Sequence, residues 1–107
     1  YYFRNHEDRL LLGGGRNLDK AGETTEDMGL NDTIQAELER LLKTVILPGV
    51  NVEIDQRWSG IMGFSENKMP IVKRIEDRRS VGLTCNGMGV ALSTLTGEKL
   101  AELLAVK

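Results

Sequence analysis

Residues that build metal sites and disulfide frameworks are almost absent from this sequence. Its 107 residues include one cysteine, Cys85, and one histidine, His6. A single cysteine excludes an internal disulfide, and one cysteine with one histidine is too few for a zinc ligand set. We therefore expect no metal site, and the two side chains alone are a poor nucleophile and base.

Long apolar runs and an excess of charge of one sign are missing as well. A transmembrane helix needs about 20 consecutive apolar residues, and a signal peptide needs a basic start followed by an apolar stretch. The sequence contains neither, and its 14 Lys and Arg against 16 Asp and Glu leave a net charge of −2 without a basic stripe. We expect a cytoplasmic protein that binds neither a membrane nor nucleic acid.

Aromatic residues are scarce, and three of the five are the first three residues, Tyr1, Tyr2 and Phe3. Chain termini are usually polar and frayed, so an aromatic strand at residue 1 resembles the middle of a sheet. Two interpretations are open: the chain is a piece of a larger protein, or it is a short domain that begins with a paired strand.

One amphipathic helix is predicted in the middle of the chain. From Ile34 to Val45 the apolar residues recur at i, i+4, i+7, i+8 and i+11, which is the spacing of one helix face. Asp32 and Gln35 have the spacing of a capping box and predict the helix start, and Pro48-Gly49 predicts its end.

The following segment, residues 50–58 (VNVEIDQRW), alternates apolar and polar side chains. A period of two predicts a strand with one buried face. Trp58 ends this strand, and we expect it in the core or, since a glycine-rich bend follows, lining a pocket.

The whole pattern predicts a single α+β module over residues 1–107, with two helices against a mostly antiparallel sheet. The order of elements is β-β-α-β-β-β-α. The predicted strands cover residues 1–4, 9–12, 50–58, 69–74 and 81–85, the helices cover 32–45 and 90–106, and a polar loop covers 16–30.

The segment that is best suited to bind a ligand joins the last strand to the last helix. Residues 84–90 (TCNGMGV) place Gly87 and Gly89 just before that helix. Glycine lets the backbone approach a ligand closely, and the first turn of a helix offers unpaired N–H groups that favour an anion or an electron-rich oxygen. The alternative is a tight turn that needs glycine for its geometry alone, with Cys85 as a small core residue.

An ordered set of motifs gives the chain a resemblance to a known family. The set resembles the C-terminal end of the D-amino-acid oxidase (DAO) family of flavoenzymes, and most closely its gamma-glutamylputrescine-oxidase-like members. The matching segments are residues 2–4 (YFR), 9–16 (RLLLGGGR), 58–65 (WSGIMGFS), 69–72 (MPIV), 86–92 (NGMGVAL), 95–97 (LTG) and 100–104 (LAELL).

The resemblance implies a division of labour along the chain. Residues 1–75 resemble part of the family's substrate domain, and residues 81–107 resemble the strand and helix that complete its FAD domain. In the family, backbone N–H groups at the start of the last helix face the pyrimidine end of the flavin. The resemblance carries this cofactor-binding role to Asn86, Gly87, Met88, Gly89, Val90 and Ala91.

The same resemblance implies something about the substrate. Met62 and Phe64 would face it, and Met62 stands where amino-acid-oxidising members often have an arginine that clamps a carboxylate. Gly87 occupies the place of a second such arginine, so an amine or a larger amino compound is expected. The cysteine that attaches flavin covalently in some relatives would fall near Ile61 and Met62, so FAD should be non-covalent. No catalytic residue is identified.

Two functional hypotheses follow. In the first, the chain is the C-terminal fragment of an FAD-dependent oxidoreductase, inactive alone because the dinucleotide-binding half is missing and FAD is bound only in the full-length parent. In the second, it is a stand-alone binding or interaction module without catalysis. In either case an uncovered apolar face around Val90, Leu92 and Leu95 is expected to drive self-association, giving a dimer.

Overall fold

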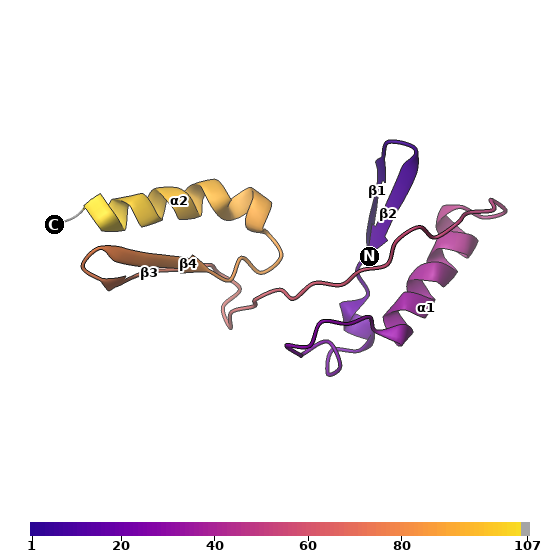
Figure 1. The fold of residues 1–107 in the computed structure, drawn as a ribbon, viewed down its shortest axis with the longest axis horizontal. Coiled ribbons are helices and arrows are strands. Elements are labelled where there is room, and N and C mark those ends of the chain that lie inside the picture. The colour runs from indigo at the N-terminus through magenta and orange to yellow at the C-terminus, as the bar shows by residue number, and fades with distance from the viewer. Residues whose placement is uncertain (106–107) are drawn as a thin grey trace. The chain divides into compact units, whose positions relative to one another are not determined.

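The computed structural model describes residues 1–105 and has an α+β fold, which confirms the predicted class (Figure 1). It contains two separate two-stranded antiparallel sheets and two α-helices rather than one larger sheet. The chain divides between Ile61 and Met62 into two compact units.

The first unit opens with a hairpin formed by the first two predicted strands. Strand β1 (Tyr2–His6) pairs with β2 (Arg9–Gly13) in a register that runs from Tyr2 opposite Gly13 to His6 opposite Arg9. The turn has two residues instead of the four predicted, and Glu7 takes a positive φ of 56° in it. All five residues of β1 are exposed, so this aromatic strand is not the middle of a sheet within this chain.

Helix α1 (Asp32–Leu41) confirms the amphipathic helix but corrects its N-cap. Its N-cap is Asn31, whose side-chain oxygen accepts hydrogen bonds from the N–H groups of Thr33 and Ile34. Gln35, predicted to close a capping box, instead donates to Glu39 at 3.1 Å. The single π-helical turn η2 (Leu42–Ile46) extends the helix. The chain leaves it at Leu47, just before the predicted stop.

A second contact fixes the position of this cap. The Asn31 side-chain nitrogen donates to the Asp19 carboxylate at 2.8 Å. That hydrogen bond, followed by one from the Gly22 N–H, lowers the pKa of Asp19. Asp19 follows the short 3-10 helix η1 (Arg16–Leu18), which lies inside the predicted loop. One asparagine therefore joins the loop to the helix.

Because Asn31 both caps α1 and holds Asp19, replacing it with alanine should destabilise the protein by about 1–2 kcal/mol. Asp32→Ala is the matched control, since the neighbouring carboxylate is exposed and caps nothing. It should cost only the few tenths of a kcal/mol of its favourable position at the helix N-terminus. Thermal denaturation of both variants measures the difference, and equal losses would contradict the assignment of the cap.

The predicted strand over residues 50–58 does not form. This segment carries no sheet pairing and is tied to the first unit by two surface ion pairs, Arg9 with Asp55 and Arg57 with Glu39. Trp58 is 66% exposed, so its expected place in the core was wrong. A period-two pattern indicates that one face of the segment is covered, but a strand also needs a paired edge, and neither β1 nor β2 pairs with this segment.

The second unit is a hairpin covered by a helix. Strands β3 (Ile71–Glu76) and β4 (Arg79–Leu83) pair antiparallel, and helix α2 (Gly89–Ala105) packs along both of them (Figure 1). The two strands and the helix confirm the predicted order for this part of the chain. The expected helix end at Val106 lies outside the described residues.

The boundary between substrate-domain and FAD-domain resemblance, expected between residues 75 and 81, falls at the turn of this hairpin. Strand β3 therefore belongs to the same compact unit as β4 and α2. The correspondence of the two halves to the family's domains stays a prediction.

Very little apolar surface is enclosed in either unit. Among residues 1–105, Ile34 is the one buried apolar side chain, at 9% exposed. The accessible area is 8775 Å², whereas a compact monomer of this mass exposes about 5,900 Å², and two globules of half the mass together expose about 7,200 Å². The two units therefore expose more surface than two compact globules of the same total mass would.

Candidate functional site

The turn before α2 has an unusual backbone. Thr84, Asn86 and Gly87 have φ values of 67°, 54° and 79°. Asparagine and glycine tolerate this left-handed region, whereas a β-branched threonine rarely adopts it. Glycine at residue 87 therefore suits the geometry of the turn, which agrees with one of the two interpretations of this segment.

The turn leaves part of the helix start without hydrogen-bond partners. The Met88 N–H donates to the Cys85 carbonyl at 2.9 Å, so this amide is engaged. Within the described part of the chain, no atom accepts from the N–H groups of Gly89, Val90 or Ala91. Together with the positive end of the helix dipole, these amides form a site that favours negative charge.

A shallow hollow lies in front of these amides. It has a volume of about 680 Å³ and lies entirely within the second unit. The residues that line it are Met62, Gly63, Cys85, Asn86, Gly87, Met88, Gly89, Val90 and Ala91. The structure therefore brings the six predicted cofactor-facing residues and the predicted substrate-facing Met62 to one place.

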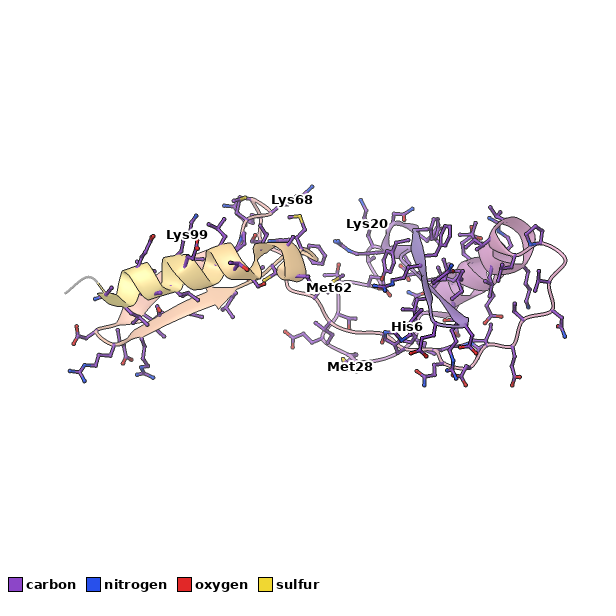
Figure 2. All side chains as sticks on the ribbon, turned by 90° about the horizontal axis from the view of Figure 1, so that it is seen from above. His6, Lys20, Met28, Met62, Lys68 and Lys99 are labelled. Atoms are coloured by element: carbon purple, nitrogen blue, oxygen red, sulfur yellow. The ribbon has the colours of Figure 1, made fainter. Side chains whose placement is uncertain are left out.

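Figure 2 labels Met62 near the N-terminal end of α2. Its sulfur lies 3.9 Å from where a Cβ of residue 87 would stand. Phe64, the other residue expected to face the substrate, is 46% exposed but does not line the hollow. Cys85, expected in the core, is half-buried on the wall of the hollow and lies beyond the end of β4.

A serine that the sequence did not single out holds this site together. The Ser65 N–H donates to the Asn86 side-chain oxygen at 2.9 Å, and the Ser65 hydroxyl donates to the Met69 carbonyl at 2.7 Å. Asn86 in turn donates to the Thr84 carbonyl at 2.6 Å. Local patterns cannot reveal a contact across 21 residues; an asparagine before glycine at a helix start was the one available signal.

No group of three or more His, Cys, Asp and Glu side chains gathers closely enough in residues 1–105 to bind a metal ion. Over the same residues, no helix has the length and apolar character to cross a bilayer.

Comparison with the curated proteins finds no match, and neither does comparison with the solved structures. A family model does match. It is described as FAD dependent oxidoreductase (DAO), and the match spans residues 1–103, which is nearly the whole chain and includes the turn, the start of α2 and Met62. The chain therefore belongs to the DAO family of FAD-dependent oxidoreductases.

Proposed function

We propose that the chain is the C-terminal part of an FAD-dependent enzyme that oxidises an amine or amino compound, and that the start of α2 faces the flavin. The observation that carries the proposal is the set of three unpartnered amides, Gly89, Val90 and Ala91, on the wall of a hollow. Their N–H groups fit the electron-rich edge of a flavin, because helix N-termini favour negative charge.

FAD supplies the acceptor for a hydride from the carbon next to the amine nitrogen, and water then hydrolyses the resulting imine. The chain's own contribution is electrostatic. The amides of Gly89, Val90 and Ala91 stabilise the negative charge that builds up on the flavin side of the site. The N–H of Met88 takes no part, because the Cys85 carbonyl already accepts it.

The side chain at residue 62 supports an amine over a plain α-amino acid. Met62 lines the hollow at the position that the resemblance gives to a carboxylate-binding arginine. A methionine offers a soft apolar surface without a charge, which suits the alkyl chain of a gamma-glutamylputrescine-like compound. Phe64 is expected to face the substrate from the resemblance alone, since it does not line the hollow. The resemblance favours non-covalent FAD, because Ile61 and Met62 stand near the place of the cysteine that attaches flavin in some relatives.

The proposed parent acts on a small molecule in the cytoplasm and contacts neither membrane nor nucleic acid. The second candidate function, a stand-alone interaction module, draws on the exposed apolar residues of α2: Val90 is 98%, Leu95 49% and Leu104 48% exposed. Such a surface should make residues 1–107 self-associate when expressed alone.

Two preparations test the proposal. The full-length protein containing this chain should purify with flavin absorbance that denaturation releases, and should oxidise amines in preference to α-amino acids. Residues 1–107 alone should show no tight FAD binding and should sediment as a dimer. Sub-micromolar FAD affinity of the isolated chain, or full-length protein without flavin, would overturn the proposal. A clean monomer at high concentration would overturn the self-association alone.

A further inference from the structure

We propose that Asn86 is a positioning residue: its side chain clamps the segment that carries Met62 and Phe64 to the turn before α2. The clamp itself stands on hydrogen bonds, whereas its effect on substrate binding rests on the function proposed above. The residues that it joins lie in one compact unit, so their geometry is fixed by that unit.

Both ends of the Asn86 amide are engaged. Its oxygen accepts the Ser65 N–H at 2.9 Å. Its nitrogen donates to the Thr84 carbonyl at 2.6 Å and to the Ser65 hydroxyl oxygen at 3.2 Å. A side-chain amide has two N–H donors, so none is left for a cofactor. Asn86 would therefore face the proposed flavin only with its backbone, because its side chain is hydrogen-bonded to Ser65 and Thr84.

The clamp also sets the position of the segment before Ser65. The place of a Cβ on Gly63 lies 3.6 Å from the Thr84 methyl group, so this segment runs directly along the turn. Met62 meets the same turn at residue 87. If Ser65 were released, the segment could move away, and the space between Met62 and the helix amides would widen.

Asn86 combines this role with its backbone conformation. At φ 54° it sits in the left-handed region, where asparagine is several-fold enriched over other non-glycine residues. A test must therefore separate the side chain from the backbone. Asn86→Gly removes the amide and keeps the conformation accessible, and Asn86→Asp keeps both the conformation and the oxygen that accepts from Ser65.

In the FAD-loaded full-length protein, Asn86→Gly and Ser65→Ala should each raise KM for the preferred amine, by about tenfold for Asn86→Gly and less for Ser65→Ala, which keeps its N–H. The affinity for FAD should change by less than about threefold, because the amide does not face the cofactor. Asn86→Asp should recover part of the loss. The matched control Ser93→Ala removes a hydroxyl that bonds only within α2, and KM should not change.

Loss of FAD with an unchanged KM would overturn the proposal, because it would place the Asn86 side chain on the cofactor. A second measurement does not need turnover. Thermal stabilities of Asn86→Gly, Ser65→Ala and the double variant should be non-additive; additive effects would overturn the clamp. Non-additivity in a protein that oxidises no amine would overturn the proposed function and the effect on KM, while the clamp itself would stand.

Discussion

Replacing Val90 with proline in the full-length protein is expected to slow reduction of the flavin by amine about tenfold to a hundredfold. Proline lacks an N–H, so the change removes one of the three amides proposed to stabilise negative charge. The helix should tolerate it, because the Val90 N–H makes no intrahelical bond and proline is accepted in the first turn. Stopped-flow absorbance during a single turnover measures the rate.

Val90→Ala is the matched control. The Val90 side chain is 98% exposed and contributes no packing within the unit, so alanine changes the side chain and keeps the amide. The preceding residue is Gly89, whose missing Cβ reduces the usual clash with a following proline. Equal rates in the proline and alanine variants, with FAD bound in both, would mean that the start of α2 does not face the reacting part of the flavin.

Local signals were enough to predict most elements of the fold. The hairpin of β1 and β2, the amphipathic α1 and the apolar α2 each depend on neighbours within a few residues, and each was found. The N-cap of α1 was not, because Asn31 and Asp32 are both good N-caps. The contact of Asn31 with Asp19, twelve residues away, is what selects between them.

Burial could not be predicted from the sequence. Alternation over residues 50–58 indicates one covered face, and Trp58 has the size of a core residue. Val52 and Ile54 are only half-buried, however, Trp58 is exposed, and neither β1 nor β2 pairs with this segment. Similarly, α2 is apolar on more than the face that meets β3 and β4, as the exposure of Val90 and Leu104 shows. A residue pattern reports that a surface should be covered but does not say what covers it.

The candidate site was predictable only where it depends on local signals in the sequence. Gly87 and Gly89 marked the turn, since positive φ and close backbone approach need glycine. The contact between Ser65 and Asn86 was not predictable, because it joins segments 21 residues apart. Nor could the sequence show that the Met88 N–H donates to the Cys85 carbonyl, because this hydrogen bond depends on how tightly the turn closes.

The second large effect is expected from Gly82, where β4 lies against α2. A Cβ at this residue would stand 2.9 Å from methyl groups of Leu100 and Thr96. Gly82→Val should therefore force the helix away from the hairpin and destabilise the protein by about 1–3 kcal/mol, despite valine's preference for strands. Thermal or urea denaturation measures the loss.

Gly97→Ala provides the opposite case on the same helix. A Cβ at Gly97 would meet nothing within 4 Å, so alanine should stabilise α2 by about 0.5–1 kcal/mol.

Leu100→Ala, added to Gly82→Val, should recover part of the lost stability, because it removes the side chain that the new methyl groups strike. Two results would contradict this packing: a Gly82→Val variant as stable as the unmutated protein, or a double variant less stable than Gly82→Val alone. Either would mean that α2 does not pack on β4 at this distance, and the position of the hollow at the N-terminus of α2 would then be wrong.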